Sequence, residues 1–126
     1  MTILNFKKKW NGKSVEDSGC YISEEAKLFA RNLRATIKEI ANKNGFNLVE
    51  WNVGHYYISG FLEKDGKYIY FIRDIERYGK TINIENSGFM NGFLVRIAKY
   101  FKDYTGGHNH FCGLSGFGDL INKLHQ

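Results

Sequence analysis

The sequence predicts an α+β domain, in which an N-terminal helix and a second helix pack on a three- or four-stranded antiparallel sheet and a short C-terminal helix follows. Three observations indicate this class: an apolar stripe at helical spacing in residues 23–44, an Asp-Gly turn between two strand-like segments, and a second helical stripe in residues 88–104. No repeat or linker interrupts the 126 residues, so we expect a single domain over 1–126, with 1–22 as a less regular N-terminal arm.

The first helix is predicted from Ser23 to about Asn44. Ser23 is a favoured N-cap residue, Glu24 and Glu25 complement the helix dipole in the first turn, and Gly45 provides a left-handed stop. The apolar positions of this segment fall on one helical face, which we expect to be buried: Ala26, Phe29, Ala30, Leu33, Ile37, Ile40 and Ala41.

Strands are predicted next, because the apolar period changes to two from Phe46 to Val53. Residues 55–63 and 67–75 then flank Asp65-Gly66, and this pair favours a two-residue hairpin turn in which both residues have positive φ. The turn sets a register that pairs Leu62 with Ile69, Gly60 with Phe71, Phe61 with Tyr70 and Ser59 with Ile72. Both faces of the hairpin are therefore partly apolar, and we expect a helix on one and a second cover or a partner on the other.

The C-terminal third is predicted to be largely helical. A short fourth strand is expected over 81–85 and the second helix from about Gly88 to Tyr104, ended by Gly106 and Gly107. Its buried stripe would consist of Met90, Phe93, Leu94, Ile97, Ala98 and Phe101. A loop is expected over 108–114, and a last helix from Ser115 would bury Phe117, Leu120, Ile121 and Leu124.

Cysteine content and hydropathy favour a soluble cytoplasmic protein. The two cysteines are too few for a disulfide framework, and no apolar run approaches the roughly 20 residues that cross a bilayer. Eighteen Lys and Arg residues against 13 acids give a net charge of +5, which favours anionic partners such as nucleic acid or acidic protein surfaces. The oligomeric state stays open.

One helix face concentrates this charge. Its basic residues recur at intervals of four, three and four on the side opposite Leu33: Lys27, Arg31, Arg34 and Lys38. Such a row can follow phosphates or an acidic protein surface, although a solvated outer face is the commoner reason for charges on an amphipathic helix. Two further groups would extend this stripe if they lie nearby, namely Lys7–Lys9 and the set Arg96, Lys99 and Lys102. A second candidate surface consists of aromatic rings that can stack on bases, those of Tyr56, Tyr57, Tyr68 and Tyr70.

Candidate chemistry centres on His108, His110 and Cys112, which are zinc-ligand types within five residues. A structural zinc site needs four ligands, usually from two separated pairs, and no second pair stands at a recognisable spacing, although Cys20 or His55 could approach in the fold. We therefore favour an ordinary loop and predict no metal or cofactor. Cys112 as a thiol nucleophile is a further alternative.

Other catalytic patterns are not found. Arg73, Asp74, Glu76 and Arg77 fit surface salt bridges better than a two-carboxylate site. A phosphate loop, a dinucleotide fingerprint and a nucleophile elbow do not occur in the sequence. We therefore assign no catalytic residue and favour a non-enzymatic protein, with an enzyme kept as an alternative.

Three stretches also form a pattern together: His55–Phe61 (HYYISGF), Lys67–Ile72 (KYIYFI) and Leu94–Lys99 (LVRIAK), the last leading into KDYTGG at 102–107. In this pattern, residues 55–107 resemble small accessory and anti-defence proteins, anti-CRISPR-like proteins among them, of phages and mobile elements of Gram-positive bacteria. The resemblance implies a mobile-element protein and transfers no functional residue. It departs at Ile72-Arg73-Asp74, where such proteins carry a serine-containing strand.

Our first hypothesis is therefore a non-catalytic binding protein of a phage or mobile element that inhibits a host defence complex, such as a CRISPR-Cas effector. Its partner would be a host protein or a protein–nucleic acid complex. The first alternative is a nucleic-acid-binding module that uses the basic helix face. The second is a small enzyme or metal-binding protein built on His108, His110 and Cys112.

Overall fold

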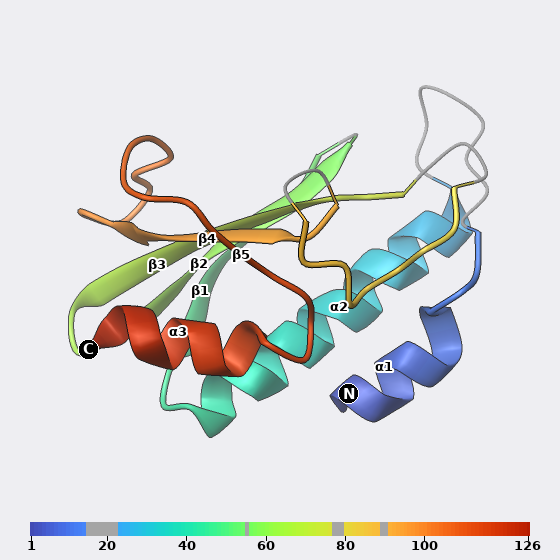
Figure 1. The fold of residues 1–126 in the computed structure, drawn as a ribbon, viewed down its shortest axis with the longest axis horizontal. Coiled ribbons are helices and arrows are strands. Elements are labelled where there is room, and N and C mark those ends of the chain that lie inside the picture. The colour runs from blue at the N-terminus through green and yellow to red at the C-terminus, as the bar shows by residue number, and fades with distance from the viewer. Residues whose placement is uncertain (15–22, 55, 77–79, 89–90) are drawn as a thin grey trace.

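The computed structural model describes residues 1–14, 23–54, 56–76, 80–88 and 91–126. Within these residues the helices are α1 (Ile3–Trp10), α2 (Glu24–Lys43) and α3 (Phe117–His125), and the strands are β1 (Asn47–Val53), β2 (Tyr57–Lys64), β3 (Lys67–Asp74), β4 (Phe93–Ala98) and β5 (His110–Cys112). The five strands form one sheet in chain order, and all neighbours are antiparallel. The three helices lie on one side of this sheet (Figure 1). The predicted α+β class is confirmed.

Helix α2 forms as the sequence predicts. The Ser23 hydroxyl accepts a hydrogen bond from the Ala26 amide at 3.1 Å, which satisfies one of the free donors of the first turn. At the other end, Gly45 adopts a φ of +81°, and the Phe46 amide donates to the Ala41 carbonyl. All seven apolar residues of the predicted stripe are buried.

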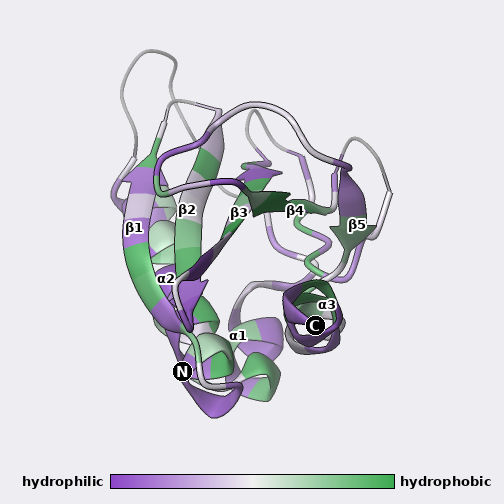
Figure 2. Ribbon diagram, turned by 90° about the vertical axis from the view of Figure 1, so that its left-hand side faces the viewer, coloured by the Kyte–Doolittle hydropathy of each residue, from purple (hydrophilic) through white to green (hydrophobic). Residues whose placement is uncertain are grey.

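The β2–β3 hairpin also has the predicted register. Asp65 and Gly66 have φ values of 55° and 77°, and the four predicted pairs, from Leu62 with Ile69 to Ser59 with Ile72, all occur. Alternate residues of these strands therefore point to opposite faces of the sheet. Figure 2 shows hydrophilic and hydrophobic residues mixed along the strands and helices, as expected of elements that bury part of their surface.

The predicted second helix is wrong, because strand β4 lies within it. Residues 94–98 pair with β3, from Leu94 opposite Ile72 to Ala98 opposite Tyr68. The apolar residues there satisfy a period of two as well as a helical one, and the free edge of β3 offers backbone partners that a helix would leave unused. As a consequence Phe93 and Val95 enter the core, whereas Ile97 and Phe101 of the predicted stripe are exposed and Met90 lies outside the described residues.

Three smaller predictions also need correction. The N-terminal arm contains α1, whose Phe6 and Trp10 rings pack against Phe29 of α2 with centroids 5.6 and 5.4 Å apart. Residues 81–85 form no strand beyond a single bridge between Thr81 and Ser14, although Ile82 and Ile84 are buried. The predicted loop 108–114 contains β5, which pairs with β4. In each case contacts far apart in sequence decide the local structure.

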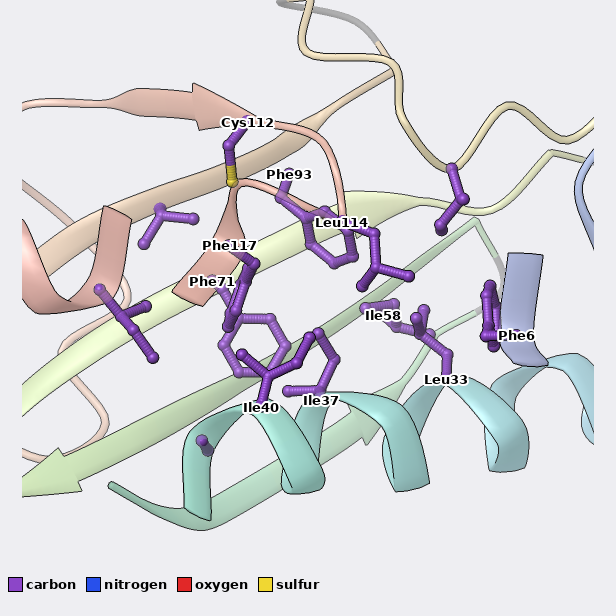
Figure 3. Packing of buried hydrophobic residues seen from close by; sticks show 14 of the residues in the cluster. Phe6, Leu33, Ile37, Ile40, Ile58, Phe71, Phe93, Cys112, Leu114 and Phe117 are labelled. Atoms are coloured by element: carbon purple, nitrogen blue, oxygen red, sulfur yellow. The ribbon is translucent and has the colours of Figure 1, made fainter. Parts of the chain in front are cut away.

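The main core lies between the helices and the sheet (Figure 3). Ile37 and Ile40 of α2 project towards Phe71 on β3 and Phe117 of α3, and Leu33 lies beside Ile58 of β2. Leu114 and Phe93 fill the space near β5. This arrangement buries one face of the sheet and leaves its other face for a different cover.

The segment 99–109, called the strap from here on, covers part of that other face. It joins β4 to β5 and rises on the side of the sheet away from the helices (Figure 1). The Phe101 ring stacks on Tyr68 at 5.5 Å and meets Phe61 edge-on at 5.7 Å, and the Tyr104 ring meets Phe61 at 5.3 Å. These contacts cover a second small cluster formed by Phe61, Tyr70 and Ala98.

Candidate binding surfaces

The two candidate surfaces lie on opposite sides of the sheet. The basic stripe belongs to α2, which packs on the first face, whereas Tyr68 and Tyr70 belong to the strap-covered second face. A single flat partner therefore cannot contact the stripe and the tyrosine rings together.

All four residues of the stripe, Lys27, Arg31, Arg34 and Lys38, are exposed. Lys27 pairs with Glu24 at 3.2 Å, one turn away. Within the described part of the chain, Arg31, Arg34 and Lys38 form no ion pair. Their charges are therefore available to an outside partner.

Helix α1 adds basic residues on the same side of the sheet. Its last turn carries Lys7, Lys8 and Lys9, and its Phe6 and Trp10 rings pack against α2. The other predicted extension is wrong, because Arg96, Lys99 and Lys102 lie on β4 and the strap rather than on a helix beside α2.

The predicted aromatic surface is only partly exposed. Tyr56 and Tyr57 are open to solvent, and Tyr68 is half-buried beneath Phe101. Tyr70 is buried, with 6% of its surface exposed, because the strap and β4 both cover it: the Tyr104 ring of the strap lies 5.8 Å away, and the Arg96 guanidinium of β4 lies 4.7 Å from the ring centroid. Tyr70 cannot therefore serve as an open stacking platform.

The His108–Cys112 segment does not assemble a reactive site within the described residues. The Cys112 side chain points into the main core, and burial, helped by the Glu85 carboxylate, raises the pKa of its thiol to about 12. His108 and His110 border a hollow of about 230 Å³ together with Lys99 and Asp103. No three metal-ligating side chains gather in the described ranges, and Cys20 and His55 lie outside them.

Arg73 and Glu76 form a buried ion pair, which corrects the prediction of surface salt bridges. The Arg73 side chain is fully buried, and its two terminal nitrogens donate to the Glu76 carboxylate at 2.6 and 2.9 Å. The same guanidinium donates to the carbonyls of Asp74 and Asn83 and lies over the Phe93 ring. Because these bonds join β3 to the segment before β4, the pair is structural. Arg77 lies outside the described residues.

A pocket that the sequence did not reveal opens on the strap side, at the ends of β1, β2 and β3. Its volume is about 440 Å³, and its wall consists of Asn52, Val53, Gly54, Tyr57, Ser59, Tyr70, Ile72 and Tyr104. Burial raises the pKa of Tyr70, with Tyr57 and Tyr104 adding to the rise while Arg96 and Ser59 oppose it. The sequence did not indicate that Tyr104 lines a pocket, because it predicted this residue at the end of a helix. We call this hollow the tyrosine pocket.

Asp103 fixes the strap over this face. Its carboxylate accepts hydrogen bonds from the amides of Lys99 and Thr105, both at 3.1 Å. These two bonds hold the pKa of Asp103 below its ordinary value. Arg96 completes the anchorage by donating to the Tyr104 carbonyl and, at 3.4 Å, to Asn109.

Comparison with known protein families, with curated proteins and with solved structures found no significant match to this chain. Among the described residues, no helix combines the length and the hydropathy that a membrane crossing requires.

Proposed function

We propose that this chain is a non-catalytic binding protein that engages an anionic macromolecular partner through the outer face of α2. The observation that carries the proposal is the row of Arg31, Arg34 and Lys38, exposed and without an ion pair among the described residues. With a rise of 1.5 Å per residue, the stripe from Lys27 to Lys38 extends roughly 16 Å along the helix. A partner with a matching row of negative charges would be attracted over that whole length.

The fold supports this assignment because the stripe has no part in holding the domain together. The opposite side of α2 supplies the core contacts, and α1 brings three more lysines to the same side of the sheet. Removing the charges should therefore change binding and leave folding intact.

The test is a charge-reversal variant, Arg31→Glu/Arg34→Glu/Lys38→Glu, compared in pull-downs from host lysate with and without nuclease. A matched control, Lys67→Glu/Lys80→Glu/Lys123→Glu, makes the same change in net charge at exposed positions away from the stripe. We expect the wild type and the control to recover the same partner and the stripe variant to lose it at least about tenfold, since repulsion replaces attraction. Failure of the wild type to recover any macromolecule, or equal recovery by both variants, would contradict the proposal.

A nucleic-acid partner is the first alternative, and salt dependence separates it from a protein partner. If three side chains contact phosphates, log K should fall against log salt with a slope of about −2 to −3. Anisotropy with labelled single-stranded and double-stranded oligonucleotides measures this slope. A flat response, or no binding at low salt, would favour an acidic protein surface.

Inhibition of a host defence complex is a more specific form of the proposal and rests on the resemblance of residues 55–107 to anti-defence proteins of mobile elements. A plasmid-interference assay in a host with an active CRISPR-Cas system tests it. Expression of the wild type should restore transformation, and the stripe variant should not. Unchanged interference would remove this form and leave the general proposal standing.

The enzyme or metal-protein alternative has less support. The thiol of Cys112 is buried and has a pKa of about 12, so it carries almost no thiolate at neutral pH. Elemental analysis of protein purified without a histidine tag is the direct test, and one metal ion per chain would revive this alternative.

A further inference from the structure

The tyrosine pocket lies on the face of the sheet opposite the basic stripe, so it is a separate site. Tyr57 and Tyr104 are 42% and 45% exposed, whereas Tyr70 is buried and Ile72 half-buried. Its volume of about 440 Å³ falls in the usual range for small-ligand pockets, about 300–1,000 Å³.

Gly54 shapes the rim. A Cβ atom at this position would come within 2.9 Å of the Tyr57 ring, so only glycine lets the ring lie against the backbone here. The close contact holds one face of Tyr57 on the protein. The ring is thus positioned as part of the wall rather than as a free surface side chain.

Polar groups are placed among these rings. Ser59 is only 3% exposed yet lines the pocket, and the Asn52 side chain lies beside it in the same wall. The Tyr70 and Tyr104 rings lie 5.8 Å apart, and Tyr57 lines the same wall. Hydroxyl and amide groups can donate as well as accept, and among the described residues of the wall none is charged.

A positive charge stands next to the pocket. The Arg96 guanidinium lies over the Tyr70 ring and donates to the Tyr104 carbonyl, so it borders two of the wall residues. The carboxylate of Asp103 in the strap is already engaged by two backbone amides. An anionic group at the pocket mouth would therefore meet a cation.

We infer that the tyrosine pocket binds an unpaired nucleobase, with the base against the tyrosine rings, its edge hydrogen-bonded to Ser59 and Asn52, and its phosphate towards Arg96. A base offers both a π-face for stacking and donors and acceptors along its edge. An aliphatic or phenylalanine side chain would fit the rings but would cover the Asn52 amide without offering it a hydrogen bond, whereas the edge of a base can donate to it and accept from it. The ligand class is therefore a nucleotide, free or within a single strand.

The direct test is titration of the protein with AMP, CMP, GMP and UMP, followed through the ring signals of fluorotyrosine-labelled protein. Ribose 5-phosphate and N-acetyltyrosinamide are the comparison probes. We expect at least one nucleotide to shift the signals of Tyr57 and Tyr104 saturably, with weaker effects from both comparison probes. Binding of ribose 5-phosphate as tight as that of every nucleotide, or of N-acetyltyrosinamide alone, would overturn the inference, as would no binding at all.

Variants locate the site. Tyr57→Ala should weaken nucleotide binding by about fivefold to a hundredfold, the range expected when a stacking ring is removed. Gly54→Ala should also weaken it by displacing the Tyr57 ring, with the fold checked by circular dichroism. Tyr100→Ala is the matched control, since Tyr100 is an exposed strap tyrosine outside the pocket wall and should change nothing. Equal effects of Tyr57→Ala and Tyr100→Ala would contradict the assignment.

The outcome is independent of the proposed function. The stripe variant Arg31→Glu/Arg34→Glu/Lys38→Glu should bind nucleotides as the wild type does, because its changes lie on the other side of the sheet. Loss of nucleotide binding in that variant would mean that the probes bind to the stripe, and it would overturn the pocket.

Discussion

The two faces of the sheet are covered in different ways. On the first face three helices bury an almost wholly apolar core, with Leu33, Ile37 and Phe71 fully buried. On the second face an irregular strap covers only part of the surface and uses aromatic rings together with polar anchors at Asp103 and Arg96. The helices cover the first face of the sheet, whereas the strap leaves the tyrosine pocket open on the second face.

The two faces should therefore contribute differently to the protein: the helix face to folding stability, and the strap face to the positions of particular side chains. Large apolar areas stabilise a domain without fixing any one contact, so the helix face should carry most of the folding free energy. A few polar anchors contribute less but hold specific side chains in specific places. The strap face should therefore loosen locally under changes that leave the helix face intact.

The largest effect should come from the buried ion pair of Arg73 and Glu76 on the helix face. Glu76→Ala leaves a buried guanidinium without its carboxylate, and it should lower the free energy of unfolding by about 3–5 kcal/mol. Urea denaturation measures it. Glu24→Ala, which breaks the exposed pair with Lys27, is the control and should cost less than about 1 kcal/mol. Similar costs for the two variants would show that the Arg73 pair is not buried in solution.

The second-largest effect on stability should come from the Asp65-Gly66 turn, whose register decides which residues of β2 and β3 lie on each face of the sheet. Gly66 has a φ of +77°, and a Cβ at this position would meet no atom within 4 Å, so strain of the backbone is the only obstacle to a larger residue. Gly66→Val should destabilise the whole domain by roughly 1–2 kcal/mol, because a β-branched residue resists positive φ. Lys67→Val, one residue on in the strand, is the matched control. Equal melting temperatures for the two would refute this account of the turn.

A smaller and local effect is expected in the strap. Asp103→Ala removes the acceptor for the amides of Lys99 and Thr105, so those amides should exchange hydrogen faster while amides of β2 and β3 are unaffected. Acid should also reduce the protection of these two amides against exchange in the wild type, because protonation of Asp103 weakens their hydrogen bonds. Because folding lowers the pKa of Asp103, its contribution is present above the ordinary carboxyl pKa and is lost as pH falls through the lower folded value. Exchange that accelerates equally in β2 and β3 would mean that the strap is not a separate unit.

The smallest effect on stability should come from the outer face of α2, which covers neither side of the sheet. The variant Arg31→Glu/Arg34→Glu/Lys38→Glu should change the free energy of unfolding by less than about 1 kcal/mol, since it removes no buried contact. Urea denaturation beside the Lys67/Lys80/Lys123 control checks this. A large loss of unfolding free energy would show that the stripe is structural. A loss of binding by this variant could then be due to misfolding, and it would not support the proposed function.

Structural features that depend on neighbouring residues could be predicted from the sequence, and features that depend on distant contacts could not. Ser23, Gly45 and Asp65-Gly66 act on the backbone close to them, so α2 was predicted with its caps and the hairpin with its register. The apolar residues around Phe93 fit two periods, and the edge of β3 selected the strand. The two surfaces differ in the same way: the exposure of Arg31, Arg34 and Lys38 follows from helical spacing, whereas the burial of Tyr70 depends on the strap.

By itself the sequence determined the α+β class, the α2 helix, the hairpin and the basic stripe, because caps, turn residues and periodicity act over a few neighbouring residues. Only the tertiary structure decided that α1 joins the core, that β4 and β5 extend the sheet, and that Arg73 is buried with Glu76. It also brought Asn52, Ser59 and Tyr104 into one wall. These features depend on contacts between distant segments, and such contacts form only when burial of both partners outweighs the entropy of ordering the chain between them.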